Sequence, residues 1–422
     1  MSPGGEPDLI STGKEGAPEQ ERKNRTMKIL VSNIGSTSFK FRLFAMRDEK
    51  EIASGGADRI GLEDGTLRIT YPGGETRSEE RAYPSHSEAV MDVMDRLVAS
   101  SVLETREDLD AIAFKAVMGG DAPAVTLVNE DILQQMEYFA PVAPAHNPPY
   151  VTAMRMFGKV LKNTPLIAAF DSGFHQSNPE RRRKYAVSPN WASRYGVKRY
   201  GYHGASHRYS SIRMKELMPE AKRVISCHLG GSSSLCAIRE GVSVATSMGL
   251  SPQSGLPQSS RSGDFDPFGI DLLRRSSGMT TDEILRILGS ESGLKALSGT
   301  SGDMREIEEA MNQGSRDAGL AFEVYVTSIR DYLGAYLVEL GGADAITFSG
   351  GIGQNSPRIR ESVCEGMGFA GIRLDRHKNN GTRTEARIDR KDSSAALWVL
   401  ETNEELIVAR QAADLLRSVT RD

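Results

Sequence analysis

Two stretches of the chain share one pattern: an apolar run, a turn of glycine and hydroxyl residues, and a second run in which apolar residues alternate. The first covers residues 28–44 and reads KILVSNIGSTSFKFRLF. The second covers residues 224–238 and reads VISCHLGGSSSLCAI. Alternation with a period of two is typical of strands, and glycine with serine favours a tight turn. Each stretch therefore predicts a β-hairpin whose turn can direct backbone N–H groups and hydroxyls at an anion.

The two hairpins indicate a duplication. Placing Gly35 on Gly230 also places Asn33 on His228. Copies so far apart in the chain exclude a short-period solenoid. We therefore expect a duplicated domain in which each half offers a phosphate-binding hairpin to a shared cleft.

The remaining pattern predicts strands and helices of an α/β protein. Apolar runs predict strands at residues 111–117, 166–170, 345–348 and 395–400. Helical spacing and capping signals predict helices over 87–98, 280–288 and 318–340 and from 402 onward, the last with Thr402 and Glu405 as a capping box. Residues 145–149, 299–305 and 349–355 are predicted to be loops or turns.

Two charged residues stand at strand ends. Lys115 interrupts an apolar strand just before Gly119 and Gly120, so it lies either at an exposed end or in a functional site. Asp171 directly follows a buried strand, where ligand chemistry is usually found in α/β proteins. The alternative role for Asp171 is a helix N-cap.

The segment 244–267, VATSMGLSPQSGLPQSSRSGDFDP, places Arg261 in a short polar loop. A guanidinium can make two charge-assisted hydrogen bonds to phosphoryl or carboxylate oxygens, so Arg261 is a candidate anion clamp. In the alternative interpretation, Arg261 only pairs with Asp264 or Asp266 on the surface.

Two histidines and a glutamate leave alternatives open. His203 and His207 are four residues apart where a loop enters a helix, which suits metal binding on one helical face, but a Glu-x-x-His context and a third ligand are missing. Glu404 is not needed for helix capping. It is therefore free to face a cleft, or it is a solvated acid in the first helical turn.

Composition narrows the class of protein. The chain has 422 residues, which exceeds the usual single-domain range, and a formal net charge of -4 gives no electrostatic reason to expect a nucleic-acid partner. No apolar run is long enough to span a bilayer. Three scattered cysteines predict a reducing, cytoplasmic setting. Residues 1–26 are polar and rich in glycine and proline, which predicts a disordered extension rather than a signal peptide.

Taken together, these residues resemble the acetate kinase family, small-carboxylate kinases of the duplicated ribonuclease-H-like fold that actin, sugar kinases and Hsp70 share. The resemblance runs from Met27 to about Leu416 and rests on many short motifs in order. They are NIGSTSFKF, AHNPP, FDSGFHQ, RYGYHGASH, CHLGGSSS, TSMGLSP, SRSGDFDP, SGDMR, SGGIGQNS and TNEEL.

The resemblance implies reversible transfer of the ATP γ-phosphoryl group to a carboxylate, which yields an acyl phosphate and ADP. By position it implies that the catalytic residues are Asp171, His203 and Arg261, and that the substrate contacts are Lys115, Val117, Tyr202 and Pro252. The Mg²⁺ (or Mn²⁺) ligands would be Asn33 and Glu404. The nucleotide contacts would be Lys40, His228, Leu229, Gly230, Gly231, Ser232, Asp303, Met304, Arg305, Gly351, Ile352, Gly353, Gln354 and Asn355.

This chain departs from the family pattern around the substrate. Lys115 stands where the family has an arginine, which keeps the charge but loses the bidentate fork. Gly231 and Ser232 replace Asn-Gly, and Gln354 replaces a glutamate. Ala145 replaces a larger apolar residue and Tyr202 a phenylalanine, so we expect a roomier and more polar pocket. Acetate should then be a poor substrate, and a longer or hydroxylated short acid should be preferred.

Three functions remain open. The first is an active carboxylate kinase. The second is a nucleotide-binding regulator that has lost efficient transfer, which Lys115 and the altered hairpin suggest. The third is a polymerising actin-like protein or a sugar kinase, which would share only the fold.

The expected architecture follows from the duplication. It has a first domain at 27–173 plus 400–422 and a second at 174–399, with a cleft that closes on ligand. The resemblance further implies a homodimer formed through the second domain, and we expect neither a nucleic acid nor a membrane as a partner.

Overall fold

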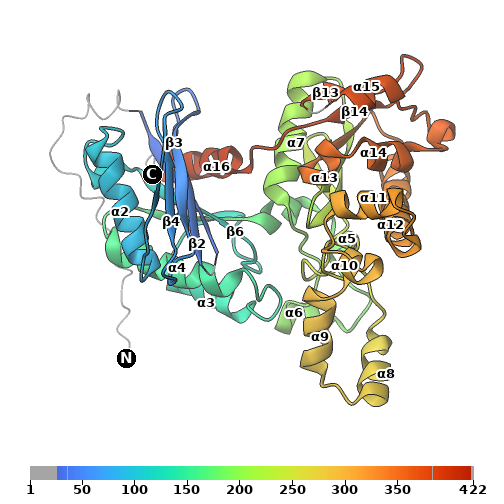
Figure 1. Cartoon of the computed structure of the whole chain (residues 1–422), viewed down its shortest axis with the longest axis horizontal. Helices are drawn as coiled ribbons and strands as arrows, with labels where there is room; N and C mark the ends of the chain where they lie inside the picture. The colour runs from blue at the N-terminus through green and yellow to red at the C-terminus, as the bar shows by residue number, and fades with distance from the viewer. Residues whose placement is uncertain (1–25, 36, 383, 420–422) are drawn as a thin grey trace, which may run out of the picture. The chain divides into compact units, whose positions relative to one another are not determined.

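The computed structural model describes residues 26–35, 37–382 and 384–419 (Figure 1). This part of the chain divides into two compact units. The first comprises the chain up to Phe114, Thr152–Ile167 and the chain from Ala412 onward, and the second comprises Lys115–Val151 and Ala168–Gln411. The N-terminal extension, apart from Thr26, and Ser36 of the first turn lie outside the described residues. The domain boundaries given above remain a prediction.

Two sheets carry the fold. The first has eight strands in the order β5-β4-β3-β2-β1-β6-β8-β7, and the second has six in the order β11-β10-β9-β12-β14-β13. The strands of the first sheet are β1 Lys28–Ile34, β2 Ser38–Ala45, β3 Lys50–Asp58, β4 Thr66–Thr70, β5 Thr76–Glu80, β6 Ala111–Ala116, β7 Val125–Leu127 and β8 Leu166–Phe170. Those of the second are β9 Arg223–Leu229, β10 Ser233–Arg239, β11 Val242–Thr246, β12 Ala345–Ser349, β13 Ala386–Arg387 and β14 Ala396–Val399.

The same arrangement of strands occurs in both sheets. An antiparallel meander, β1-β2-β3 in one and β9-β10-β11 in the other, is followed by a strand parallel to its first member, β6 and β12 respectively. Both predicted hairpins are thus confirmed, and they occupy equivalent places. This is the topology expected of the duplicated fold.

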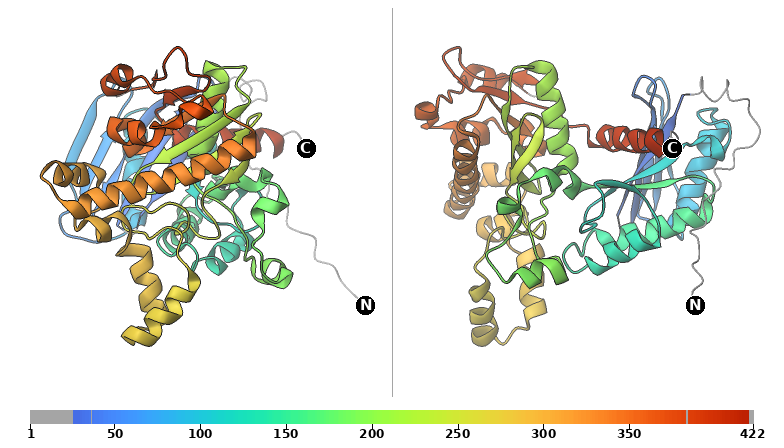
Figure 2. Two further views of the ribbon diagram at one scale, coloured as in Figure 1. Left: turned by 90° about the vertical axis from the view of Figure 1, so that its right-hand side faces the viewer. Right: turned by 180° about the vertical axis from the view of Figure 1, so that it is seen from behind.

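The helices lie mostly on the faces of the sheets, as the views in Figure 2 show. They are α2 His86–Ala99, α3 Glu130–Tyr138, α4 Asn147–Val160, α5 Glu180–Arg183, α6 Pro189–Tyr195, α7 Gly204–Leu217, α8 Pro267–Ser277, α9 Thr281–Ser290, α10 Gly293–Ser298, α11 Met304–Asn312, α12 Arg316–Leu340, α13 Gly350–Asn355, α14 Pro357–Cys364, α15 Arg376–Gly381 and α16 Glu404–Val419. Short 3₁₀ segments occur at Arg106–Asp108, Asp171–Ser177 and Met367–Ala370. Within the described ranges, none of the helices has the length and apolarity required to cross a membrane.

The second sheet is covered differently on its two faces. Ile225, Cys227 and Leu229 of β9 face the long helix α12 in one large apolar core. The side chains between them point to the other face because a strand alternates direction at every residue. That face lies against α7, where Val224 and Met214 share a smaller apolar cluster. The rest of the α7 side is polar, and this layer carries several site residues.

Three local predictions were wrong. Asn147, Pro148 and Pro149 are not a loop but the first turn of α4, where proline fits because its missing N–H has no helical partner. Residues 350–355 form the short helix α13 rather than a turn. Asn403, not Thr402, caps the last helix: its Oδ1 accepts a hydrogen bond from the backbone N–H of Leu406 at 3.1 Å.

Arg360 holds the C-terminal end of α13 in place through hydrogen bonds. This arginine is fully buried, and its guanidinium donates to the carbonyls of Gly353 and Gln354 at 2.8 and 2.7 Å. It also donates to Oδ1 and to the carbonyl of Asn379 at 2.7 and 3.0 Å. Carbonyls at a helix end have no partner within the helix. Arg360 therefore satisfies groups that would otherwise be buried without one.

We predict that Arg360→Met lowers the free energy of unfolding by about 3 kcal/mol, because several buried carbonyl groups lose their donor. Urea-induced unfolding measures this change. The matched control is Arg358→Met, which changes a neighbouring side chain whose hydrogen bond to Asn312 Oδ1 is exposed. Equal costs for the two variants would contradict a supporting role for Arg360.

Candidate active site

An ion pair joins Lys115 at the end of β6 to Glu404 at the start of α16. Lys115 Nζ donates to Glu404 Oε2 at 2.5 Å, and the two side chains are 24% and 14% exposed. Burial opposes charge on both groups, but the lysine charge holds the pKa of Glu404 below its usual value. The pKa of Lys115 is raised by Glu404 and Asp171 in spite of the burial that works against it. The lysine is therefore a partly buried cation that is paired with a carboxylate, and its place in a functional site stays a prediction.

Asp171 interacts with this ion pair through its charge. It follows β8, is buried, and accepts hydrogen bonds from the backbone N–H groups of His203 and Ala205 at 3.0 and 3.3 Å. Burial raises the pKa of Asp171, and the Lys115 charge opposes this rise. The Asp171 carboxylate thus serves the N-terminus of α7, and its charge interacts with those of Lys115 and Glu404. Its role in ligand chemistry stays a prediction.

His203 stands at the N-cap of α7 in a left-handed backbone conformation with φ of 57°. Such a conformation is unfavourable for a residue with a Cβ and tends to occur at functional sites. Its ring lies 4.4 Å from the ring of His228, measured between centroids. Burial lowers the pKa of His203 well below its ordinary value, and the charges that His228 and His207 would carry lower it further. His203 is therefore a neutral imidazole at pH 7.

Arg261 has neutral partners. Its Nη1 donates to Ser232 Oγ at 3.2 Å and to Gln258 Oε1 at 3.0 Å. Asp264 instead accepts from Gly255 N and Tyr332 Oη, and Asp266 caps α8. In the described part of the chain, Arg261 thus makes no ion pair with either aspartate, which argues against the surface-pair interpretation. Its partial burial lowers its pKa without bringing a countercharge.

Gln258 organises the Arg261 loop, and the sequence did not single it out. It is 1% exposed, and its Oε1 accepts from both Ser232 Oγ and Arg261. Its Nε2 donates to the carbonyl of Pro252 at 2.8 Å. The loop also packs so closely on α10 that a Cβ at Gly293 would lie 2.2 Å from the Gln258 carbonyl. A glutamine of this kind has no periodic signal in the sequence. The sequence shows only that Gln258 lies in a segment rich in serine and proline.

The second hairpin turn lies next to the start of α13, which directly follows β12. β9 and β12 are parallel and pair His228 with Ser349, so the turn 230–232 and the start of α13 lie at the same sheet edge. A Cβ at Gly350, where φ is 74°, would lie 2.5 Å from the Leu229 carbonyl. The two glycine-rich segments predicted to bind nucleotide, 228–232 and 351–355, are thus brought together.

Two of the predicted nucleotide contacts have side chains that point elsewhere. Leu229 and Met304 are buried in the apolar core of the second unit, so only their backbones can face a ligand. Asp303 caps α11 and pairs with Arg305 at 2.6 Å, and the Arg305 side chain is 90% exposed.

Two of the four predicted substrate residues lie in an apolar cluster. Tyr202 and Val117 pack together with Met118, Tyr200 and Met248. The hydroxyl of Tyr202 donates to the Leu250 carbonyl at 2.5 Å. It is therefore committed to the protein, which removes one reason to expect a polar pocket.

In the first unit, Asn33 and Lys40 are direct partners across β1 and β2, and both are exposed at the end of the first hairpin. Asn33 and Glu404 supply an amide and a carboxylate oxygen, the donors that Mg²⁺ prefers. No cluster of three or more histidine, cysteine, aspartate or glutamate side chains suited to a metal occurs among residues 26–35, 37–382 and 384–419. Each of the two side chains thus carries an oxygen of the type that Mg²⁺ takes, and the metal site stays a prediction.

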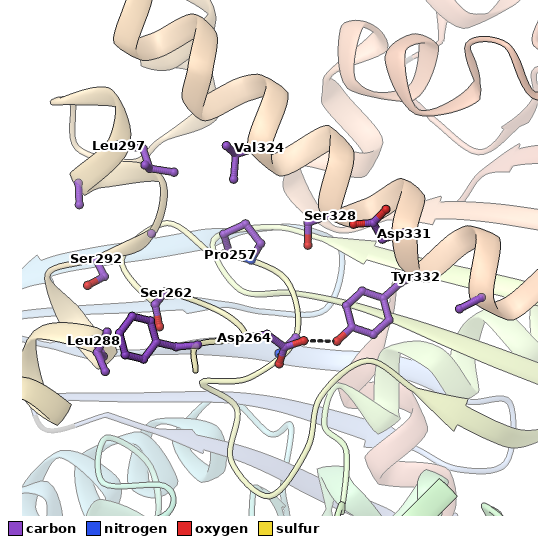
Figure 3. A pocket seen from close by; sticks show the side chains of 15 residues that line it. Pro257, Ser262, Asp264, Leu288, Ser292, Leu297, Val324, Ser328, Asp331 and Tyr332 are labelled. Carbon is purple, nitrogen blue, oxygen red and sulfur yellow. Dashed lines mark hydrogen bonds between the residues drawn. The ribbon is translucent and has the colours of Figure 1, made fainter. Parts of the chain in front are cut away.

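A cavity lies beside the loop that carries Arg261. It has a volume of about 660 Å³ and is lined by the 255–265 segment, α9, α10 and α12. Figure 3 shows Asp264 on the wall of this cavity, hydrogen-bonded to Tyr332 of α12, with Val324 and Ser328 farther along the same helix. Arg261 does not line it.

The Acetokinase family profile matches residues 28–410. This chain belongs to the acetokinase family. Its sequence is 39% identical to the acetate kinase of Halothermothrix orenii over 398 residues, which cover 93% of this chain and all of that protein. Members of this family are phosphotransferases with a carboxyl group as acceptor, and the prediction of an ATP-dependent carboxylate kinase is confirmed at that level.

Solved structures confirm the fold class. The acetate kinase of Porphyromonas gingivalis is 34% identical with a TM-score of 0.84, and the alignment covers 92% of this chain and all of that one. A propionate kinase from Francisella tularensis is 30% identical, also with a TM-score of 0.84, over 91% and 98% of the two chains. The chain thus has the α/β, duplicated ribonuclease-H-like fold predicted from its motifs.

Proposed function

We propose that this protein transfers the γ-phosphoryl group of ATP to a small carboxylic acid in the presence of Mg²⁺, reversibly, giving an acyl phosphate and ADP. One observation carries the proposal: Arg261, which has no carboxylate partner among the described residues, bonds to the second hairpin in the unit that also holds His203, Lys115 and Asp171. The proposal is supported by membership of the acetokinase family.

The chemistry calls for positioning and charge stabilisation. Phosphoryl transfer spreads negative charge over the equatorial oxygens of a loose transition state. Arg261 would donate two charge-assisted hydrogen bonds to these oxygens, and the neutral His203 one more. A carboxylate acceptor is already ionised at pH 7, so no general base is needed. Asp171 would then act by holding the N-terminus of α7, and with it His203.

Asn33 and Glu404 would hold Mg²⁺. When bound, the ion would supply charge neutralisation on the phosphate oxygens. Glu404 already pairs with Lys115, so a bound Mg²⁺ would share the Glu404 carboxylate with the Lys115 ammonium group. We further infer nucleotide contacts from Lys40, 228–232, 303–305 and 351–355.

The acid is proposed to be longer than acetate. Val117, Tyr202 and Pro252 would surround its alkyl part, and Lys115 would face its carboxylate. An ammonium is a point charge and orients a carboxylate less firmly than a guanidinium does. Since the Tyr202 hydroxyl is already bonded, an apolar extension fits better than a hydroxyl group. One relative of similar fold is a propionate kinase.

A regulator without efficient transfer is the second candidate. The Lys115–Glu404 ion pair favours this function. The lysine proposed to bind the substrate and the glutamate proposed to bind the metal are bonded to each other, so neither is open to its ligand. Such a protein would bind ATP and yield no acyl phosphate. For either function we infer a cytoplasmic location, since all three cysteines are free and buried.

We propose that the protein is a homodimer joined through α8 and α12. α8 exposes Phe268 and Leu272, one helical turn apart, at 82% and 66%. α12 exposes Leu320, Val324 and Val338, and Val324 borders the cavity of Figure 3. Large exposed apolar side chains are typical of a protein interface, and a second copy is the occupant that the family relationship supports.

We predict that a longer acid outperforms acetate by roughly tenfold in kcat/KM, the effect of one methylene in an apolar pocket. The assay traps acyl phosphate as hydroxamate with ATP, Mg²⁺ and acetate, propionate, butyrate or lactate. Arg261→Ala should lower the signal about a thousandfold, whereas Arg286→Ala, at an exposed pair with Glu291, should not. Acetate as the best acid would refute the preference. Retained ATP binding with no product from any acid would favour the regulator.

We predict that Lys115→Arg raises kcat/KM for acetate about tenfold, mainly through KM, because the guanidinium restores a bidentate contact. Steady-state kinetics with acetate measures the change. Lys198→Arg, which alters a surface lysine paired with Asp121, is the control. Unchanged acetate kinetics would mean that Lys115 suits another substrate.

We predict that Phe268→Asp combined with Leu272→Asp converts the dimer to a monomer at micromolar concentration, because two charges enter an apolar contact. Size-exclusion chromatography with light scattering reports the mass. Phe369→Asp is the matched control, since Phe369 is 88% exposed but lies on a different element. A monomeric parent protein, or equal behaviour of both variants, would rule out this interface.

A further inference from the structure

The polar layer between α7 and the second sheet contains an unbroken line of hydrogen bonds that ends at His203. Ser226 Oγ lies 2.9 Å from His207 Nδ1. His207 Nε2 lies 2.8 Å from Ser234 Oγ, and the same Oγ lies 2.8 Å from His203 Nδ1. Ser226, Ser234 and His207 are fully buried. We call these four residues the serine–histidine chain.

The secondary structure explains why the chain forms. Ser226 and His228 alternate with the apolar residues of β9 and so point at α7 rather than at α12. Ser234 pairs directly with His228 across the hairpin and shares that face. His207 lies one turn into α7 from His203, which brings both rings over the same part of the sheet.

The number of protons that the serine–histidine chain shares among its hydrogen bonds is fixed. Burial and the neighbouring histidines lower the pKa of His203 and of His207 well below the ordinary value, so both rings are neutral at pH 7. A neutral imidazole has one N–H donor and one acceptor nitrogen, and a serine hydroxyl has one proton. Four such groups in a line can point their protons in only two consistent directions.

A fully buried donor without an acceptor is unfavourable, and this selects one of the two directions. If the protons point from His203 toward Ser226, the Ser226 hydroxyl proton needs a further acceptor. Within the described residues, His207 is the only hydrogen-bond partner of Ser226 Oγ. If the protons point the other way, Ser226 donates to His207 Nδ1, His207 Nε2–H donates to Ser234, and Ser234 donates to His203 Nδ1. Every proton inside the layer then has an acceptor. The one proton without a partner among the described residues is on Nε2 of His203, which is only partly buried, rather than on the hydroxyl of the fully buried Ser226.

We infer that the serine–histidine chain holds His203 in the tautomer with its proton on Nε2. Nε2 has no partner in the part of the chain that the structure describes, so it is the nitrogen that faces a ligand. In this tautomer it is a neutral N–H donor and not an acceptor. Ser226, His207 and Ser234 are positioning residues for that donor. The inference deepens the proposed function, because it rests on the role of His203 beside the transferring phosphoryl group.

The direct test is the ¹⁵N spectrum of the histidine rings in the full-length protein, with the His203 signals assigned by comparison with His203→Gln. We expect an unprotonated Nδ1 and a protonated Nε2 in the parent protein. Ser226→Ala should allow the reverse direction and add a population protonated at Nδ1. It should also lower kcat for acyl phosphate formation about a hundredfold with KM within about twofold, because the donor is lost only where charge develops. Ser226→Thr, which keeps the hydroxyl, should restore both.

The matched control is Ser210→Ala. Ser210 is a buried serine of α7, but its hydroxyl has no hydrogen-bond partner among the described residues, so neither the spectrum nor kcat should change. A parent spectrum with the proton of His203 on Nδ1, or on both nitrogens, would overturn the inference, and so would an unchanged tautomer in Ser226→Ala. If Ser226→Ala does not fold, Ser234→Ala and the parent spectrum decide in the same way. Since the spectrum needs no turnover, a failure to find any acid substrate would count against the proposed function alone.

Discussion

Two hydrogen bonds from the start of α7 to the Asp171 carboxylate fix the relation between the two structural elements that carry the chemistry. β8 ends at Phe170, directly before Asp171, and α7 begins directly after His203, whose backbone N–H is one of the donors. A helix N-terminus has unpaired N–H groups and a partial positive charge, so a carboxylate is a favourable partner there. The same contact gives the carboxylate its orientation and holds His203 in its left-handed conformation. The rest of the polar layer on the α7 side of the sheet is built around this contact.

Much of the fold was readable from the sequence. The hairpins at 28–44 and 224–238 could be found because strand alternation and turn chemistry are local properties, and both occur where expected. The capping box at Thr280 and Glu283 is present for the same reason. The errors fall where a local signal has two meanings. Two consecutive prolines suit a rigid loop and also the first turn of a helix, and only the position of α4 in the structure distinguishes them.

The site was less readable, because its partners are far apart in the chain. Lys115 and Glu404 were both named as candidates, but their pairing depends on the arrangement of β6 and α16. Gln258 passed unnoticed although it bonds to Ser232, Arg261 and Pro252, since a glutamine in a serine-rich loop has no distinctive pattern. The serines behind His203 were seen only as part of a turn or strand. Buried polar networks of this kind are decided by packing, not by sequence period.

One contact described above connects the chemical centre with the scaffold. Asp264 takes the backbone N–H of Gly255 on one carboxylate oxygen and the hydroxyl of Tyr332 on the other, which closes the stretch around Arg261 into a loop fastened to α12. α12 is also the backbone of the large apolar core in its unit. The loop that carries the Arg261 guanidinium is thus anchored to α12, the longest of the described helices. A rotation of that helix about its own axis would displace Arg261 through the Tyr332 phenol and the Asp264 carboxylate, and also through the Tyr325 hydroxyl, which bonds Ser233 next to the Arg261 partner Ser232.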